Sequence, residues 1–395
     1  MPSQNPGFLP SVLLIHNHYR IPGGEDTVFS AERDLLQSHG HRVIVYERTN
    51  AEPAGAWQKL TMALSALYNR RAAREVRALI RREKPDIVHI HNTLLCISPS
   101  VFRAAKAEGV PVVMTLHNFR LLCPNGILMR EGQVCEDCPH GSLRCAVRSA
   151  CYRGSKAQSL VVAAMLGLHR LLGTWRGVTL AALTEFDRQK LLEFNALHRV
   201  FDEDRLVVRP NPVVLSDPGE VPVLNQIVYA GRLEELKGLR TVIEAWRLLE
   251  DDAAMPRLIV AGSGPLEGWA QENAGPNVTF AGRLTRDGLD RAMAQSRAVV
   301  AASLCYESFA LVPAEAHGLG VPVLASDLGN VGASVKEGVD GLHFAPGDPA
   351  ALADAVRALC ARDWDRNAIR RAAREQYSAG ESYRSLMALY GQCGK

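Results

Sequence analysis

Short apolar runs alternate with amphipathic stretches along the chain, and this alternation predicts its elements. Residues 12–15 ("VLLI") are a continuous apolar run of the kind found in buried parallel strands. Apolar residues at helical spacing from Val28 to Leu36 then mark one face of a helix, which Gly40 ends. Residues 42–46 form the next strand. The N-terminal part of the chain therefore reads strand, helix, strand.

The same pattern continues to the C-terminal half. Two further apolar strands, "PDIVHIHN" (85–92) and "VPVVMTLHN" (110–118), each end in His-Asn. Later strands are "QIVYAG", "RLIVAGSG", "NVTFAG", "AVVAAS" and "VPVLAS", with helical segments between them. Such alternation predicts α/β architecture, with parallel sheets and right-handed crossovers. We expect two Rossmann-like domains facing one another across a cleft, with ligands at the carboxyl ends of the strands. That rule places these residues at the cleft: His91, Asn92, His117, Asn118 and the 303–309 loop.

A proline-rich loop at 209–225 ("RPNPVVLSDPGEVPVLN") marks the expected domain boundary. We expect an N-terminal Rossmann-like domain over 1–212, with a cysteine-rich insertion at 119–155. A C-terminal Rossmann-like domain over 213–375 would follow, and a helix over 376–395 would return to the N-terminal domain.

Composition narrows the class of protein. The 395 residues are 47% hydrophobic and 22% charged, as in soluble globular proteins, and a net charge of +3 is too small to indicate a nucleic-acid partner. The opening "MPSQNPGFLP" has no signal-peptide pattern, and the longest apolar run, Leu160–Leu168, is too short to span a membrane. Nine cysteines without a secretory signal suggest a reducing cytosol, so we expect a cytoplasmic protein.

Candidate chemistry in the C-terminal half follows the strand ends. The segment "GRLEELKG" (231–238) supplies Arg232 and Lys237. The turn "GSGP", with Gly262 and Gly264, would let the backbone approach a ligand closely, and "GRL" with Arg283 is similar. These segments predict a ligand site along one edge of the sheet.

The fourth segment is "ESFALVPAE" (307–315). Pro313 suits the first turn of a helix, which we expect to run from Pro313 to about Leu319, so that its N-terminus lies between Glu307 and Glu315. Free N–H groups and the helix dipole make that end an anion site, and the Arg and Lys would add charge for a diphosphate. Glu315 would accept hydrogen bonds from ribose hydroxyls, and Glu307 would hold a sugar hydroxyl. The pattern predicts a nucleotide-sugar site.

These motifs resemble those of a known family. "ESFALVPAE" followed by "AHGLGVPVLASDLGN" resembles the signature of retaining glycosyltransferases of family 4, the group 1 type with the GT-B fold. "YAGRLEELKGL" is similar to that family's Arg/Lys segment, "GGEDTVF" and "TLHN" to its N-terminal glycine loop and histidine, and "PGDPAALADAV" to its distal helix entry. The resemblance covers nearly the whole chain.

The resemblance implies metal-independent transfer of a sugar from a nucleoside diphosphate donor with retained configuration. The acceptor would attack on the front face, and the leaving phosphate would take its proton. A glycan or lipid-linked acceptor, in bacterial cell-surface polysaccharide synthesis, is the family's common setting. A glutamate that the family often carries is missing near Ala333, which leaves the expected catalytic roles unchanged.

The resemblance also implies roles for individual residues. Arg232 and Lys237 bind the diphosphate, Glu307 contacts the donor sugar, and His117 lies beside the transferring sugar. This makes the expected catalytic set Glu307, His117, Arg232 and Lys237. The full expected donor-binding set is Gly23, Gly24, Arg232, Lys237, Gly262, Gly264, Arg283, Glu307, Phe309, Ala310, Leu311 and Glu315.

Simpler interpretations stand beside this one. Arg232 and Lys237 are also consistent with solvated surface charges, and Glu315 with a residue that favours a helix start. His91 and His117 are also consistent with core histidines at strand ends. Other classes are a nucleotide-sugar epimerase of similar fold, a glycosidase, which also uses paired carboxylates, and a non-catalytic zinc-bearing scaffold on a transferase fold. The joint pattern favours the transferase.

The insertion holds a cluster of cysteines. Cys-x2-Cys with outlying cysteines in a cytosolic chain is typical of a structural tetrahedral zinc site. The preferred ligands are Cys123, Cys135, Cys138 and Cys151, with Cys145 or His140 as substitutes. Free thiols or a disulfide are the alternatives.

Two helical segments suggest a membrane surface. Residues 69–84 carry seven Arg/Lys against two Glu, and residues 153–176 are apolar with basic ends and a Trp. Together they resemble a patch that binds anionic lipids, so peripheral association with the inner membrane leaflet is a hypothesis. A solvated charged face and a buried helix are the alternatives.

Overall fold

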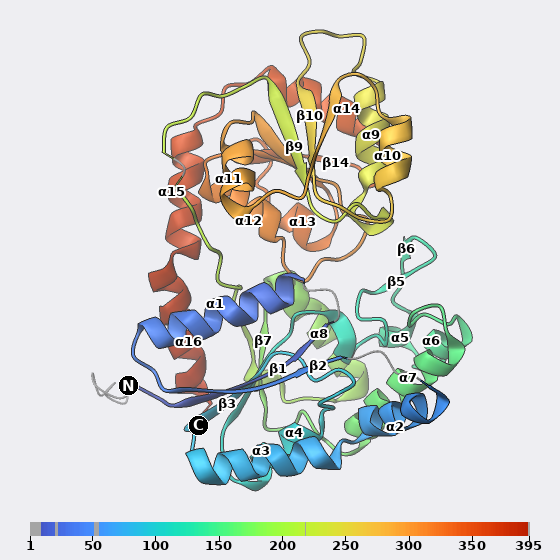
Figure 1. The fold of residues 1–395 in the computed structure, drawn as a ribbon, viewed down its shortest axis with the longest axis vertical. Coiled ribbons are helices and arrows are strands. Elements are labelled where there is room, and N and C mark those ends of the chain that lie inside the picture. The colour runs from blue at the N-terminus through green and yellow to red at the C-terminus, as the bar shows by residue number, and fades with distance from the viewer. Residues whose placement is uncertain (1–8, 20–22, 51–54, 218, 394–395) are drawn as a thin grey trace. The chain divides into compact units, whose positions relative to one another are not determined.

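The computed structural model describes residues 9–19, 23–50, 55–217 and 219–393 (Figure 1). Contacts group the chain into two compact units. Unit 1 comprises Met1–Leu128, Glu136–Pro212 and Ser382–Lys395, and unit 2 comprises Met129–Cys135 and Val213–Glu381. Residues 1–8, in which no signal segment is expected, and Pro218 of the proline-rich loop lie outside the described residues.

Unit 1 is built on a six-stranded sheet of order β2-β1-β3-β4-β7-β8, in which every pairing is parallel. Its strands are β1 Val12–His18, β2 Val43–Thr49, β3 Ile87–Ile90, β4 Val112–Thr115, β7 Thr179–Ala182 and β8 Leu206–Val208. Four of them lie where the apolar runs predict strands.

Helices cover both faces of this sheet, as parallel crossovers require. They are α1 Gly24–Ser38, α2 Ala56–Leu67, α3 Arg70–Glu83, α4 Ser100–Ala107, α7 Lys156–Leu171, α8 Glu185–His198 and the C-terminal part of α16 Ala379–Gln392. Leu386 and Leu389 of α16 share a buried cluster with Val12 and Phe29. The C-terminal helix therefore returns to the first sheet, as expected.

The cysteine-rich insertion consists of short elements. These are η1 Phe119–Leu121, α5 Asp137–His140, α6 Arg144–Arg148 and the antiparallel hairpin of β5 Met129–Arg130 with β6 Gln133–Val134. A further 3₁₀ turn, η2 Glu203–Arg205, precedes β8.

Unit 2 repeats the architecture with the sheet order β11-β10-β9-β12-β13-β14, again entirely parallel. Its strands are β9 Gln226–Ala230, β10 Arg257–Ala261, β11 Val278–Gly282, β12 Ala298–Ala301, β13 Val323–Ser326 and β14 Gly341–Phe344. Its helices are η3 Glu235–Lys237, α9 Leu239–Arg247, α10 Glu267–Asn273, α11 Arg286–Ala294, α12 Leu311–Gly318, α13 Gly329–Ala333, α14 Pro349–Cys360 and α15 Arg366–Tyr377. The predicted α/β class with two Rossmann-like halves is confirmed.

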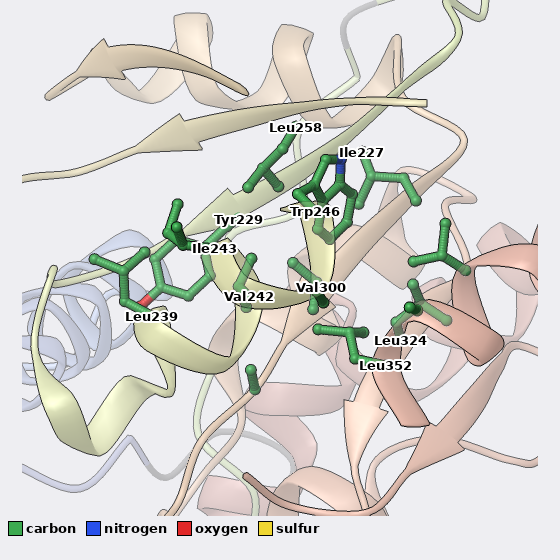
Figure 2. Close-up of a cluster of buried hydrophobic side chains, with 14 of the residues drawn as sticks. Ile227, Tyr229, Leu239, Val242, Ile243, Trp246, Leu258, Val300, Leu324 and Leu352 are labelled. Atoms are coloured by element: carbon green, nitrogen blue, oxygen red, sulfur yellow. The ribbon is translucent and has the colours of Figure 1, made fainter. Parts of the chain in front are cut away.

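A dense core fixes the strands of unit 2 that carry the site. Trp246 and Ile243 of α9 pack on Tyr229 of β9 and Val300 of β12, and all four side chains are at most 2% exposed (Figure 2). The indole N–H of Trp246 donates to the carbonyl of Pro256 at 2.9 Å, which satisfies the one polar atom of that buried ring. The loops that follow β9 and β12 therefore start from rigid ends.

No helix within the described ranges has both the length and the apolarity needed to cross a membrane.

Candidate functional site

In unit 2 the structure brings Lys237 and Glu307 together. The loop after β9 is held from below by Tyr229, whose hydroxyl lies 3.1 Å from the carbonyl oxygen of Arg232 and 3.3 Å from that of Lys237. The amide of Leu304 donates to the carbonyl of Leu236 at 2.9 Å, and so ties this loop to the segment after β12. The Lys237 ammonium consequently lies 2.9 Å from the Glu307 carboxylate.

The surroundings of this pair keep it charged and oriented. The Ser303 hydroxyl donates to the Glu307 carboxylate, and the Asn330 amide donates to the Glu307 carbonyl. Burial disfavours the charge on Lys237, but attraction from Glu307 outweighs it and raises the pKa of Lys237. About a third of the Lys237 side chain and a fifth of the Glu307 side chain stay exposed, at 32% and 19%. The pair is thus preformed and still open to an anion or a hydroxyl.

The two predicted arginines are more exposed. The Arg232 side chain is 56% exposed and pairs with Glu234 at 3.3 Å, within its own loop. Arg283 follows β11 and is also exposed. In the part of the chain that the structure describes, neither arginine forms an ion pair with Glu307, and Lys237 is the cation of the close pair.

The glycine turn after β10 packs against its neighbouring loop. A Cβ at Gly262 would lie 1.8 Å from the carbonyl oxygen of Gly231, and the backbone φ of Gly262 is +148°. A Cβ at Gly264 would lie 2.5 Å from the carbonyl oxygen of Leu233. The expected reason for these glycines was close approach to a ligand, but the approach that the structure shows is to the Arg232 loop. The turn thereby buttresses the loop that carries Lys237.

The helix at "ESFALVPAE" begins earlier than predicted. α12 starts at Leu311, so Pro313 is its third residue and Glu315 lies in the second turn. Proline is tolerated there because the first-turn N–H groups have no partner within a helix. Ala310 is buried, whereas Phe309 and Leu311 are half-buried beside it. The helix N-terminus still lies between the two glutamates.

Glu315 is paired with a residue that the sequence reasoning missed. Arg286, in the first turn of α11, donates to Glu315 and also contacts Asp290 at 2.9 Å. Burial raises the pKa of Glu315, although the guanidinium of Arg286 opposes this shift. An arginine 29 residues away from Glu315 gives no local signal, and only the pairing of β9 with both β10 and β12 sets the elements that bring it near.

In unit 1 the predicted strand-end residues line one cavity of about 40 Å³. The His117 side chain is half-buried, and its Nε2 lies 2.9 Å from Nδ1 of His91. The lining residues include His91, Asn92, His117, Asn118, Arg120, Met165 and Trp175. The four residues expected at the cleft from this unit are therefore neighbours.

The glycine loop leads into α1 beside this cavity. Gly23 is the N-cap residue and Gly24 the first residue of α1, and both are exposed. The Gly23 amide donates to the Asp26 carboxylate at 2.9 Å, which fixes the start of the helix. Glu25 next to it hydrogen-bonds with Asn92 and Asn118, and burial raises its pKa to about 8. Residues 20–22 of the loop lie outside the described residues.

Two of the predicted zinc ligands meet. The thiols of Cys123 and Cys138 are hydrogen-bonded to one another, and this lowers the pKa of Cys123 to about 6. Among the described residues, the groups of three or more ligand atoms that all lie within 4.8 Å of one another include no cysteine. The four predicted ligands are thus not gathered into one coordination sphere. The structure forms no disulfide among the cysteines.

The basic segment at 69–84 forms a groove with its neighbour. α3 and α4 line it with Arg70, Arg74, Arg77, Arg103 and Lys106, and Tyr68 at the end of α2 adds to the lining. Glu108 pairs with Arg77 and Arg81, so part of the positive charge is compensated. In the apolar segment at 153–176, α7 buries Val162, Met165 and Leu166 but leaves Leu160 57% and Leu171 85% exposed.

Comparison with known proteins identifies the class. Crystal structures of a glycosyltransferase from Rickettsia africae (16% identity, 98% of this chain and 100% of the other, TM-score 0.66) and of Anabaena HepE in complex with UDP (16% identity, 97% and 100%, TM-score 0.62) share the fold. The protein is a glycosyltransferase of GT-B fold.

Family models then place it more closely. A model described as "Glycosyl transferases group 1" matches residues 225–362, and one described as "Glycosyltransferase Family 4" matches residues 22–133. The chain belongs to the family 4, group 1 glycosyltransferases. A similar curated relative is a glycogen synthase of Mycobacterium tuberculosis, 27% identical over 86% of this chain and 76% of that protein. A phosphatidyl-myo-inositol mannosyltransferase of Mycobacterium leprae is 27% identical over 54% of this chain and 58% of its own length.

Proposed function

We propose that the protein transfers a sugar from a nucleoside diphosphate sugar to a glycan or lipid-linked acceptor with retained configuration and without a catalytic metal. The observation that carries this proposal is the Lys237–Glu307 pair, 2.9 Å apart, which joins the loop after β9 to the segment between β12 and α12. A cation at this place can take the charge of the leaving diphosphate, while Glu307 accepts a sugar hydroxyl. Relatives point the same way, since the Anabaena protein binds UDP.

In this proposal catalysis consists of positioning and charge stabilisation. Lys237, helped by Arg232 and the first N–H groups of α12, would stabilise the diphosphate as its bond to the sugar breaks. Glu315 would hold the ribose, and His117 would contact the transferring sugar. The acceptor proton would pass to the departing phosphate oxygen.

Donor binding and transfer test this function together. A thermal-shift panel of nucleoside diphosphates and nucleotide sugars should give selective stabilisation by one donor. Lys237→Ala and Glu307→Ala should each lower transfer by roughly 10²–10³-fold, as removal of a transition-state donor does elsewhere. Arg240→Ala is the matched control, because Arg240 pairs with Glu235 at 2.7 Å in the next exposed turn. Unchanged transfer in both site variants would refute the site.

Zinc in the insertion stays a prediction. The contact between the Cys123 and Cys138 thiols supports it, because two ligands are already adjacent. Metal analysis of the purified protein is the measurement. About one zinc per chain, lost in Cys138→Ser, is expected, and less than a trace with all thiols free would overturn the idea.

A membrane-surface acceptor is the remaining part of the proposal. The Arg-lined groove of α3 and α4 and the exposed Leu160 and Leu171 of α7 support peripheral binding on an anionic leaflet. Flotation with vesicles that contain anionic lipid should recover the protein at low salt, and vesicles of neutral lipid should not. Absence of binding to anionic vesicles at low salt would contradict it.

A further inference from the structure

A chain of polar side chains lies beneath His117, within unit 1. His117 follows β4, His91 directly follows β3, and Glu32 belongs to α1. Nε2 of His117 lies 2.9 Å from Nδ1 of His91, and Nε2 of His91 lies 3.3 Å from Oε1 of Glu32. The two imidazole rings are stacked, with centroids 5.1 Å apart and planes 18° apart. Three elements that are distant in sequence thus present a continuous line of polar atoms to one histidine.

Glu32 is held as a buried carboxylate at the far end of this line. Its side chain is 0% exposed, and Arg209 after β8, 2% exposed, pairs with its other oxygen. Burial disfavours the charge, but Arg209 and His89 outweigh burial and hold the pKa of Glu32 well below its usual range. His89 also lies 2.9 Å from Oε1 of Glu32, and the Tyr390 hydroxyl lies 3.0 Å from the same His89 nitrogen. An ionised carboxylate can only accept hydrogen bonds, so it imposes a direction on its neighbours.

The carboxylate fixes which nitrogen of His91 carries the proton, and His91 in turn fixes the proton position on His117. Burial lowers the pKa of His91 to about 4 and that of His117 well below its ordinary value, so both rings are neutral near pH 7. A neutral imidazole has one N–H and one bare nitrogen. Nε2 is the ring nitrogen of His91 that faces the Glu32 carboxylate, 3.3 Å away, so the negative charge favours the proton on Nε2 and leaves Nδ1 bare. Nε2 of His117 must then carry the proton that faces Nδ1 of His91, and Nδ1 of His117 is left unprotonated.

We infer that Glu32, acting through His91, is a positioning residue that fixes His117 as the Nε2–H tautomer and so gives the site an unprotonated Nδ1. This inference rests on the proposed function. A bare imidazole nitrogen accepts a hydrogen bond from a sugar hydroxyl and repels a phosphate or carboxylate oxygen, whereas an N–H at the same place would donate to any of these oxygens. His117 therefore selects for a hydroxyl on the transferring sugar.

The tautomer can be observed without any substrate. Nitrogen-15 NMR of histidine-labelled full-length protein, with His117 assigned through His117→Gln, distinguishes a protonated from a bare Nδ1. The expected result is Nε2–H at His117, and a mixed or Nδ1–H spectrum would overturn the inference. Because no donor is present, this outcome is independent of whether the proposed function holds.

Two matched variants then test the path. His91→Phe removes the acceptor that faces His117, whereas His89→Phe alters a neighbour of Glu32 and His91 and leaves the His91–His117 nitrogen pair in place. We expect His91→Phe to give a mixture of tautomers and about a tenfold loss of kcat/KM, without further loss when His117→Ala is added. His89→Phe should keep the tautomer. Full additivity of His91→Phe and His117→Ala would refute the path while leaving the transferase assignment intact.

Discussion

The two units hold their charged side chains in opposite ways. In unit 1 the Glu32–Arg209 pair is 0% and 2% exposed, and two histidines, His89 and His91, lie beside Glu32. In unit 2 the Lys237–Glu307 pair is 32% and 19% exposed and rests on a loop that Tyr229 supports from the core. Each unit places its polar residues at the carboxyl ends of a parallel sheet, but only the second leaves them open to solvent.

The difference separates two tasks. A buried charge is costly unless it is paired and hydrogen-bonded, so the groups of unit 1 cannot exchange partners without a large loss of stability. The buried groups of unit 1 are therefore suited to holding other side chains in one orientation. A part-exposed pair loses little when one partner turns to a ligand, so Lys237 and Glu307 suit donor binding. Three predictions test this contrast between the two units.

The largest expected effect is a loss of folding stability at acid pH, and it should be greater in unit 1 than in unit 2. Burial lowers the pKa of His16, His91 and His169 to about 4 from 6.5. The unfolded chain therefore binds more protons between these values, so stability present above pH 6.5 is lost as the pH falls towards 4, by up to about 3 kcal/mol per histidine. Urea unfolding at pH 7 and pH 5, followed by hydrogen exchange resolved by unit, is the measurement.

Unit 2 provides the internal comparison for this experiment. Its His317 also has a lowered pKa because of burial, but Asp340 opposes the shift. Earlier or equal acid loss in unit 2 would contradict the contrast.

The second-largest effect should come from the removal of one partner from each ion pair, which should destabilise unit 1 much more than unit 2. Arg209→Met leaves Glu32 buried without its guanidinium partner and should destabilise unit 1 by about 3–5 kcal/mol. Lys237→Met should change the free energy of unfolding by no more than about 1 kcal/mol, although it abolishes most transfer. Denaturant unfolding of both variants gives the numbers. Comparable destabilisation in the two would mean that Lys237 also has a structural role.

The sequence predicts this fold because buried parallel strands appear in it as short continuous apolar runs. The apolar runs at 12–15 and 85–92 fall on β1 and β3, and the loop residues Lys237 and Glu307 fall at strand ends as the parallel-sheet rule requires. β14 was missed because "GLHF" opens with a glycine and a histidine interrupts its apolar run. The start of α12 was misplaced by two residues, since proline fits any position of a first turn.

The buried network of unit 1 could not be predicted in the same way. Glu32 and Arg209 are 177 residues apart, and each one reads locally as a surface charge on a helix or in a loop. Their meeting depends on β8 lying at one edge of a sheet whose order is not the order of the chain. Arg286 escaped notice for the same reason. The local sequence pattern predicts at which edge of the sheet the functional residues lie. The strand order of the sheet determines which charged side chains meet there.

The smallest expected effect concerns Arg286, whose guanidinium pairs with Glu315. An ionised carboxylate accepts hydrogen bonds from ribose hydroxyls more strongly than a neutral carboxyl group does. Burial already raises the pKa of Glu315, and Arg286 limits that rise. Loss of the guanidinium in Arg286→Met should therefore raise the pKa of Glu315 further and weaken donor binding as the pH falls.

The measurement is the donor KM of Arg286→Met between pH 8 and pH 6. We expect KM to rise by roughly tenfold towards pH 6, equivalent to about 1.4 kcal/mol, and to stay nearer the wild-type value at pH 8. Arg286→Lys, which keeps the positive charge, is the matched control and should show a flatter profile. A pH-independent KM in Arg286→Met would mean that Glu315 does not depend on this pair, and its assignment to the ribose would lose its electrostatic support. In that case only the Lys237–Glu307 pair, and not the Arg286–Glu315 pair, would turn a charged partner towards the donor.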